Sequence, residues 1–511
     1  MKKVILFIAA FILVLKFFSC AGSSNMIMPG ANQKFNDPPA PKFTAVSVHD
    51  PSVFTSESGE FYVMGSHLAT AKTTDFIEWH QVTTDWNSKP NAFYPQNNPN
   101  PAVQTMQAQI DDVMRGSRDG LGFYAGDIHK MPSGKFYQYY CITSSWYCSA
   151  IGLAVADAAE GPYITHGLLV RSGEAATGSA TPDGTGAWAV SSSPNCIDPQ
   201  AFFDKDNVNF YMTYGSWSGG IFIMELDPVT GMLKAGSQIN AENRGYGRKL
   251  IRNNHVSIEG PYIIYSPETQ YYYMFLSYGG LAAKGGYNMR VFRSRNPDGP
   301  YDDPRHPGRD LGTDMRFSEH FNYGVKIMGG YKFESLPGES SDFSTEFLSP
   351  GHNSVYYDSA TGRYFLIYHQ RFGFGSEYHQ VRVCEMFLNE DGWFAAAPFR
   401  YDGGEIRSFT AGSIPGTWKV INHGISINTF ALQSEAYEFL SSGQIKGPDN
   451  SSGTWELKSD GQTAYITIDE ILYKGVFLRC YDEDKEQWVM AFTALSADGI
   501  ALWGAGAALA R

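Results

Sequence analysis

Cysteine is scarce in this chain of 511 residues, with six in all and no Cys-x-x-Cys pair. Because that spacing is absent, the common structural zinc sites are excluded. Five cysteines remain once Cys20 is set aside, namely Cys141, Cys148, Cys196, Cys384 and Cys480. An odd set does not predict a closed disulfide framework. Cys141 and Cys148 could pair, and buried free thiols are an equal alternative.

Basic residues are also fewer than acidic ones. The chain has 39 Lys and Arg and 52 Asp and Glu, which gives a net charge of −13. A chain of this sign repels nucleic acids and anionic membranes, so a neutral partner fits better. Aromatic residues make up 15% of the chain and glycines number 53, which favours a turn-rich β protein. Aromatic faces can stack on sugars, although most aromatic side chains fill β cores.

The apolar run near the N-terminus, Val4 to Leu15, is too short for a comfortable membrane span. It follows the basic residues Lys2 and Lys3 and precedes Cys20, a pattern that resembles a bacterial lipoprotein signal with Cys20 as the lipidated residue. A simple signal peptide or an uncleaved anchor is the alternative. Each version places the mature protein outside the cytoplasm, and residues 21–42 are interpreted as a tether.

An aromatic segment recurs five times between residues 43 and 404, and each copy is typical of a β-strand. The copies begin at Phe61, Phe136, Phe210, Tyr271 and Tyr364. Five units of about 60 to 90 residues, each with several strands, predict an all-β five-bladed β-propeller. A generic β-sandwich is the alternative. The Gly-, Ser- and charge-rich stretch 309–350 is expected to be a functional loop or a disordered insertion.

The pattern changes at about residue 405, where short strands alternate with turns up to residue 511. Segments such as Gly416–Val420 and Gln487–Phe492 predict a small C-terminal β-barrel or sandwich. No catalytic arrangement is visible there. We expect this domain either to bind a glycan or only to pack against the propeller.

Three acidic residues, Asp50, Asp198 and Glu259, occupy similar positions, each just before an aromatic strand. A single Asp-Pro pair is ordinary turn chemistry and carries little weight. One carboxylate in each of several repeats, however, predicts side chains that converge on a common axis. Converging carboxylates are the groups that hydrolyse glycosidic bonds.

These residues stand within an ordered set of motifs. The set comprises His49-Asp50-Pro51-Ser52, Ser144-Ser145, Ile197-Asp198-Pro199, Ser216-Trp217-Ser218-Gly219, His255 to Tyr262, Asn322 to Gly329 and Ser349 to Ser354. Because the motifs occur together and in this order, the chain resembles glycoside hydrolase family 43, and within it the secreted endo-α-1,5-L-arabinanases. The resemblance covers about residues 43 to 400 and extends through the C-terminal domain.

The resemblance implies inverting hydrolysis of internal α-1,5-L-arabinofuranosidic bonds of arabinan. Asp50 would be the general base, Glu259 the general acid, and Asp198 the residue that orients Glu259 and raises its pKa by like-charge repulsion. Base and acid would stand ~6.5–9.5 Å apart to admit a water molecule. We expect a monomer that acts on arabinan or arabino-oligosaccharides. An exo-acting α-L-arabinofuranosidase or β-xylosidase, a retaining enzyme acting on fructans and a non-catalytic glycan-binding lipoprotein are the alternatives.

Further site residues follow from the same resemblance. His49, Asp127, Ser145 and Trp217 would contact the substrate, and His352 would bind one calcium ion near the propeller axis. Calcium normally prefers several oxygen ligands, so a histidine ligand completed by waters is unusual. A loop histidine bonded to the backbone is the alternative for His352. Relatives often carry Trp-Ala-Pro-Asp where this chain has Phe123 to Asp127, which puts individual sugar contacts in doubt.

Overall fold

A computed structural model describes residues 26–85, 93, 104–113, 122–173 and 188–509. The expected signal segment, with Cys20, lies outside the described residues. No helix in the described ranges is long and apolar enough to cross a membrane. Helical segments are short: α1 (Met106–Val113), α2 (Gln238–Ala241), α3 (Leu311–Asp314), and the 3-10 turns η1 (Ser66–Leu68), η2 (Glu242–Gly245), η3 (Phe317–Asn322), η4 (Ala411–Ser413) and η5 (Pro448–Asn450).

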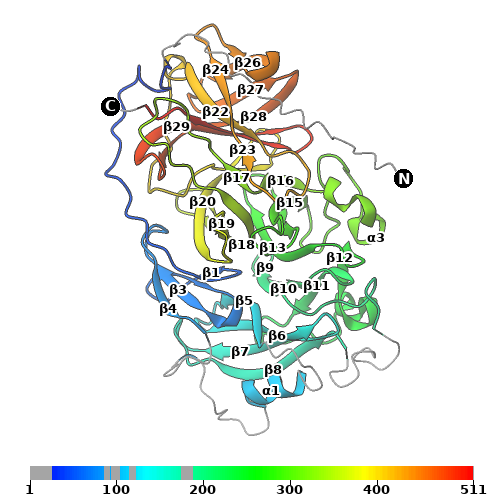
Figure 1. The fold of residues 1–511 in the computed structure, drawn as a ribbon. Helices are drawn as coiled ribbons and strands as arrows, with labels where there is room; N and C mark the ends of the chain where they lie inside the picture. Colours follow the sequence, from blue (N-terminus) through cyan, green and yellow to red (C-terminus); the bar gives the residue numbers. More distant parts are fainter. Residues whose placement is uncertain (1–25, 86–92, 94–103, 114–121, 174–187, 510–511) are drawn as a thin grey trace, which may run out of the picture.

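Five sheets, each built on four antiparallel strands, form a five-bladed propeller, as the repeat predicted (Figure 1). Blade 1 is β1 (Ser52–Thr55), β2 (Phe61–Met64), β3 (Thr70–Thr73) and β4 (His80–Thr83). Blade 2 is β5 (Phe123–Lys130), β6 (Phe136–Ser145), β7 (Cys148–Ala156) and β8 (Ile164–Arg171). Blade 3 is β9 (Gln200–Phe203), β10 (Phe210–Tyr214), β11 (Gly220–Leu226) and β12 (Arg248–Arg252).

The last two blades connect to the second domain. Blade 4 is β13 (Ile258–Ser266), β14 (Tyr271–Tyr278), β15 (Asn288–Ser294) and β16 (Val325–Met328). Blade 5 is β18 (Phe347–Asp358), β19 (Arg363–Phe372), β20 (His379–Leu388) and β21 (Phe394–Ala396), and its sheet is extended by β17 (Tyr331–Lys332) and β23 (Leu432–Gln433). The stretch 309–350 therefore contains two strands, the start of a third and short helices rather than one long loop.

The recurring aromatic segments are the second strands of the five blades. β10 is buried at every position, and β6 at all but its last two. A strand in the middle of a blade has both faces covered by neighbouring blades, so its side chains need not alternate between apolar and polar. This explains why the repeat appears as a continuous aromatic run.

The C-terminal region forms a closed eight-stranded barrel above the propeller in Figure 1. Its strands are β22 (Gly416–Asn422), β24 (Glu435–Phe439), β25 (Gln444–Lys446), β26 (Ser452–Leu457), β27 (Thr463–Ile468), β28 (Ile471–Asp482), β29 (Gln487–Ser496) and β30 (Ala501–Gly506). Trp418, Phe439, Phe477 and Phe492 pack against one another in its core. An eight-stranded barrel has room for little more than its own side chains, so these rings fill the interior.

Polar contacts fix the barrel to the propeller. The buried ammonium of Lys326, on β16, donates to the carbonyls of His423 and Ser426 at 2.8 and 2.7 Å. Arg382, on β20, forms an ion pair with Glu483 of the barrel. These contacts join the propeller and the barrel through one buried lysine and one ion pair.

Part of the expected tether, residues 26–42, lies within the described residues and contacts the barrel. From residue 26 it runs beside the barrel and then along one side of the molecule to blade 1 (Figure 1). Asp37 pairs with Arg407 and Arg479, both at 2.7 Å, and the Trp488 indole donates to the Pro38 carbonyl at 3.1 Å. These partners lie more than 360 residues away in sequence, so local composition could not predict them.

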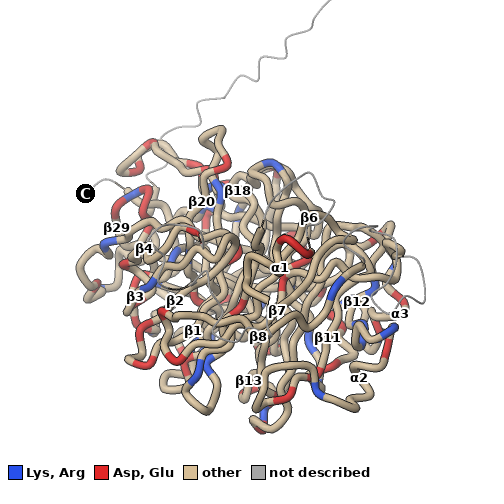
Figure 2. Tube along the Cα trace, turned by 90° about the horizontal axis from the view of Figure 1, so that it is seen from below, with Lys and Arg blue, Asp and Glu red and all other residues tan. Residues whose placement is uncertain are grey.

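The cysteines and the surface charges complete the picture. Cys141 and Cys148 are not bridged: each buried thiol donates to a backbone carbonyl instead, that of Tyr124 and that of Val113. In the view of Figure 2, Lys and Arg are interspersed with Asp and Glu.

Candidate active site

The first strand of each blade lies at the centre of the propeller. β5 contacts β1 and β9, β13 contacts β9 and β18, and the ring closes between β18 and β1. A residue with positive φ stands just before or within each of these strands: Asp50 (58°), Ala125 (27°), Asp198 (58°), Gly260 (62°) and, in the middle of β18, His352 (46°). This left-handed conformation is uncommon outside glycine, although aspartate tolerates it.

Register shifts accompany these residues in three blades. They fall between Tyr124 and Asp127, between Glu259 and Tyr262, and between Gly351 and Ser354. Such a bulge bends the strand and re-aims a side chain that would otherwise enter the sheet. In blades 4 and 5 these shifts stand beside Glu259 and His352, which both line the axial cavity.

A cavity of about 390 Å³ opens at this end of the ring. Its lining residues are Ser47, His49, Asp50, Ser66, His67, Ala69, Thr84, Tyr124, Ile197, Asp198, Glu259, Leu281, Tyr287, His352 and His379. The cavity therefore brings together the three acids singled out in the sequence, along with His49 and His352. It draws on all five blades, as expected for side chains that converge on a common axis.

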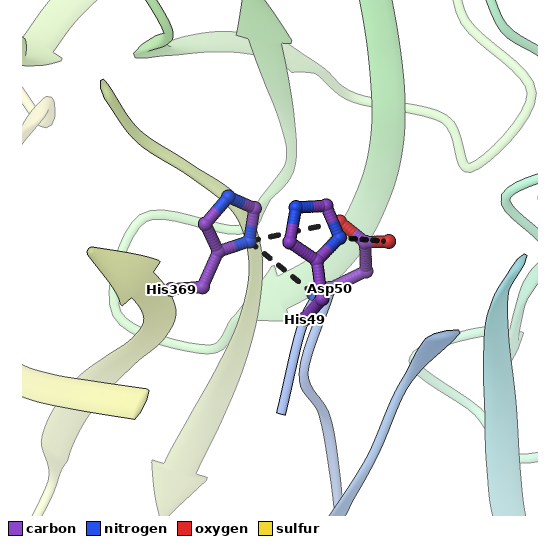
Figure 3. A group of neighbouring side chains, drawn as sticks. All are labelled: His49, Asp50 and His369. Atoms are coloured by element: carbon purple, nitrogen blue, oxygen red, sulfur yellow. Dashed lines mark hydrogen bonds and ion pairs between the residues drawn. The ribbon is translucent and has the colours of Figure 1, made fainter. Parts of the chain in front are cut away.

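Asp50 is held by several polar neighbours (Figure 3). Its Oδ2 accepts from His49 Nδ1 at 2.7 Å and from the Ser66 hydroxyl at 2.5 Å. Its Oδ1 lies 3.2 Å from His352 Nδ1, and its backbone N–H donates to His369 Nδ1 at 3.2 Å. Burial alone would raise the pKa of Asp50, but the surrounding imidazoles outweigh it and hold the pKa well below its usual value. Asp50 is therefore ionised.

Glu259 has the opposite character. Burial and the charge of Asp50 raise its pKa to about 7, against hydrogen bonds from Ser216 and Trp217 that lower it. Burial, Glu259 and Asp50 raise the pKa of Asp198 well above its usual value. Asp198 Oδ2 accepts from the Gly260 N–H at 3.2 Å, next to Glu259 in the chain. An ionised carboxylate beside proton-holding carboxyls can perform general acid–base hydrolysis.

Like-charge repulsion acts on both buried acids: Asp50 raises the pKa of Glu259, and Glu259 and Asp50 both raise the pKa of Asp198. The Gly260 N–H connects Asp198 to the residue next to Glu259. That Asp198 orients Glu259 and raises its pKa stays a prediction. Environment, which a sequence does not display, decides which of three similar carboxyls is charged.

Three other predicted residues lie outside the cavity lining. Asp127 is buried between blades, where it accepts from the Ser52 hydroxyl and from the Ala201 N–H at 2.8 Å. Ser145 ends β6, and its hydroxyl has no hydrogen-bond partner within the described part of the chain. Trp217 is half-buried, and its ring meets His255 edge-on at 5.4 Å. Asp127 links blades, whereas Trp217 reaches the site through Glu259.

Sequence reasoning missed the hydroxyls that hold the carboxylates. Ser66 donates to Asp50, and Ser216 donates to Glu259 Oε2 at 2.8 Å. Both follow a glycine directly after an aromatic strand, as Gly65-Ser66 and Gly215-Ser216. This repeated Gly-Ser was a usable signal, because a residue at the end of the second strand lies beside the start of the first. His369 and His379 carried no comparable signal.

A trio of residues and a single histidine are the candidate cation ligands beside the cavity. His49, Asp50 and His369 place their ligand atoms within 4.8 Å of one another. The rings of His49 and His369 are stacked at 4.0 Å, however, and both Nδ1 atoms already bond to Asp50. That of His49 bonds to the carboxylate, and that of His369 accepts from the backbone N–H. This trio does not fit a metal. His352 fits better: it borders the cavity, and burial lowers its pKa so that its ring is neutral and can donate a lone pair.

The chain is similar to known glycoside hydrolases in both of its domains. The model of Glycosyl hydrolases family 43 matches residues 42–313, and that of a C-terminal lipocalin-like domain matches residues 398–504. The chain is 43% identical over 471 residues to extracellular endo-alpha-(1->5)-L-arabinanase 2 of Bacillus subtilis (strain 168), which covers 91% of this chain and 94% of that protein. It is 39% identical over 475 residues to the extracellular endo-alpha-(1->5)-L-arabinanase of Thermotoga petrophila, with the same coverage.

Solved structures are similar over the whole described fold. The crystal structure of endo-1,5-alpha-L-arabinanase from Thermotoga petrophila RKU-1 has a TM-score of 0.79 and 38% identity, and the match covers 91% of this chain and 99% of that chain. A glycoside hydrolase family 43 protein from Bacillus licheniformis gives a TM-score of 0.80 with 38% identity and the same coverage. The similarity therefore spans both the propeller and the barrel.

Proposed function

Because this chain belongs to glycosyl hydrolase family 43, we propose that it hydrolyses internal α-1,5-L-arabinofuranosidic bonds of arabinan with inversion. One observation carries the assignment of roles: three carboxyls share a cavity, yet Asp50 is ionised while the pKa of Glu259 is raised to about 7. Relatives named as endo-arabinanases, similar over nine-tenths of the chain, supply the substrate class.

Asp50 acts as the general base. Its Oδ2 is occupied by two donors, His49 and Ser66, so Oδ1 is the atom that accepts the proton of the attacking water. The water oxygen bonds to the anomeric carbon from the face opposite the leaving group. A single displacement of this kind inverts the configuration, and it requires the base to stay ionised at the working pH.

Glu259 acts as the general acid. As the bond between the anomeric carbon and the leaving oxygen breaks, the electron pair passes to that oxygen, which takes the proton of Glu259. A pKa of about 7 keeps this proton in place in mildly acidic and neutral solution while still allowing its transfer. Asp198 accepts from the Gly260 N–H and so holds the peptide that follows Glu259.

His352 holds a cation in this proposal, with calcium as the expected ion and water as most of its ligands. A Cβ at Gly260 would lie 3.2 Å from the His352 ring, so glycine there lets the ring pack close to the catalytic residues. The cation would supply positive charge that helps keep nearby carboxylates ionised. Calcium should raise the melting temperature of the EDTA-treated protein but not of the His352→Ala variant. Equal responses of the two proteins would refute this site.

The first test uses residues 21–511 on debranched linear arabinan, with reducing ends and product sizes followed over time. A ladder of oligosaccharides establishes an endo-acting enzyme, and free arabinose alone establishes an exo-acting one. Glu259→Gln should lose ~10²–10⁴-fold in turnover. Glu268→Gln, an acid outside the cavity, is the matched control and should match wild type. No release by the wild-type protein would overturn the proposed function.

We also propose an extracellular location, since the named relatives are extracellular proteins. Lipid attachment at Cys20 is a separate proposal, and this residue lies outside the described part of the chain. The intact mass of the protein purified from its membrane fraction tests the second point. A diacylglyceryl mass increment on a chain that begins at Cys20 supports the anchor, and an unmodified N-terminal Met1 rejects it.

A further inference from the structure

We propose that Arg371 is a positioning residue that fixes the tautomer of His49, and through it the hydrogen bond that His49 donates to Asp50. Arg371 lies on β19 in blade 5, whereas His49 precedes β1 in blade 1. The contact therefore crosses the junction between the first and last blades. The inference rests on the proposed function in that it assigns a role around the general base.

The hydrogen bonds of His49 determine where its proton lies. The Nη2 atom of Arg371 is 3.1 Å from His49 Nε2. A guanidinium has donors only, so Nε2 must be the acceptor and carries no proton. The remaining proton of the neutral ring is on Nδ1, which lies 2.7 Å from Asp50 Oδ2. His49 is thereby set to donate to the carboxylate.

The other neighbours of His49 do not compete for this role. His369 stacks on its ring at 4.0 Å, and its Nδ1 accepts from the Asp50 backbone N–H. His379 meets the ring edge-on at 5.1 Å, and its Nε2 pairs with the Ser47 hydroxyl at 3.1 Å. Arg371 and Asp50 thus act on opposite ring nitrogens: the guanidinium requires a lone pair on Nε2, and the carboxylate favours the proton on Nδ1. In the opposite tautomer the Nδ1 lone pair would face the Asp50 carboxylate.

Arg371 is itself firmly held, with 4% of its surface exposed. Its Nε donates to the Leu281 carbonyl at 2.6 Å, and its Nη1 lies 3.2 Å from the Glu377 carboxylate. The same carboxylate accepts from the Ala283 N–H at 3.0 Å. Leu281 lines the cavity, so the two loops of blades 4 and 5 beside the cavity hold the arginine that orients His49.

A double-mutant cycle tests this arrangement. Arg371→Met and His49→Ala should each lower kcat by about tenfold, with little change in KM, and the double variant should be no worse than either single one. Arg371→Lys retains a donor and should recover most of the loss. Arg363→Met removes a partly exposed arginine of the same strand, paired with Glu385 away from the cavity, and should leave kcat unchanged. Losses that multiply in the double variant would overturn the proposal.

A readout independent of activity is the tautomer itself. In ¹⁵N-histidine-labelled protein, the His49 ring, identified by its absence in His49→Ala, should show the proton on Nδ1. In Arg371→Met, Nε2 no longer faces a cation that has donors only, so the spectrum should show Nε2 gaining a proton, either in an imidazolium ring or in a mixture of tautomers. An unchanged Nδ1–H signal would refute the role of Arg371 even if the protein proved inactive on arabinan, so this result is separable from failure of the proposed function.

Discussion

The hydroxyl of Ser216 donates a hydrogen bond to Glu259 at 2.8 Å, in the same way that Ser66 donates to Asp50 in another blade. The same kind of serine hydrogen bond is thus made to two carboxyls that differ in protonation state. Imidazoles surround Asp50 and keep it charged, whereas burial and the charge of Asp50 raise the pKa of Glu259. The division between base and acid comes from the surroundings rather than from the repeated contact.

Removing that hydroxyl should move the alkaline limb of the pH profile. The Ser216 hydrogen bond stabilises ionised Glu259 and lowers its pKa, so Ser216→Ala should raise this pKa above about 7. The acid then keeps its proton to higher pH, and the alkaline limb of kcat/KM should move up by about one unit. Ser218→Ala, whose hydroxyl pairs with His255, is the control on the same loop. A shift to lower pH would contradict the proposed role of Glu259.

Glu259→Gln should stabilise the fold in alkaline solution. The folded pKa of Glu259, about 7, exceeds its ordinary value of 4.5, so between these values the folded state binds more protons than the unfolded state. Wild-type stability contributed by this group is full below pH 4.5 and is lost as the pH rises through 7. The melting temperature of the variant relative to wild type should therefore increase from pH 5 to pH 8. A constant difference across this range would show that Glu259 is not buried as described.

A variant of Asp127 can show whether this residue stabilises the fold or contacts the substrate. It accepts hydrogen bonds from Ser52 in blade 1 and from Ala201 in blade 3. Asp127→Asn should lower the free energy of unfolding by about 1–3 kcal/mol, because a buried acceptor is replaced by a donor facing donors. Urea denaturation measures this loss, and kcat and KM per folded molecule should stay close to wild type. A raised KM with unchanged stability would favour the substrate contact that the sequence analysis predicted.

The ammonium of Lys326 makes the junction of the two domains sensitive to pH. Burial and the neighbouring Arg290 lower the pKa of Lys326 to about 7, below its ordinary value of 10.5. Between these values the unfolded state binds more protons, so this lysine favours folding increasingly as the pH rises. Compared with Lys326→Met, wild type should gain melting temperature from pH 7 to pH 9. A difference that shrinks over this range would mean that the ammonium stays charged in the folded protein.

The sequence by itself determined the propeller, the barrel and the principal carboxyls. Aromatic second strands repeat because the middle of every blade is buried on both faces, and Asp50, Asp198 and Glu259 repeat because each precedes or begins a first strand. Such features are local and periodic, so they can be predicted from the sequence alone.

Only the tertiary structure decided which carboxyl is charged, where the proton of His49 lies, and that Asp127 links blades. Each depends on residues distant in sequence, such as Arg371, which stands 322 positions from His49. Burial and the field of neighbouring groups act over a few ångströms of space, and no pattern along the chain records which groups folding will bring within that range.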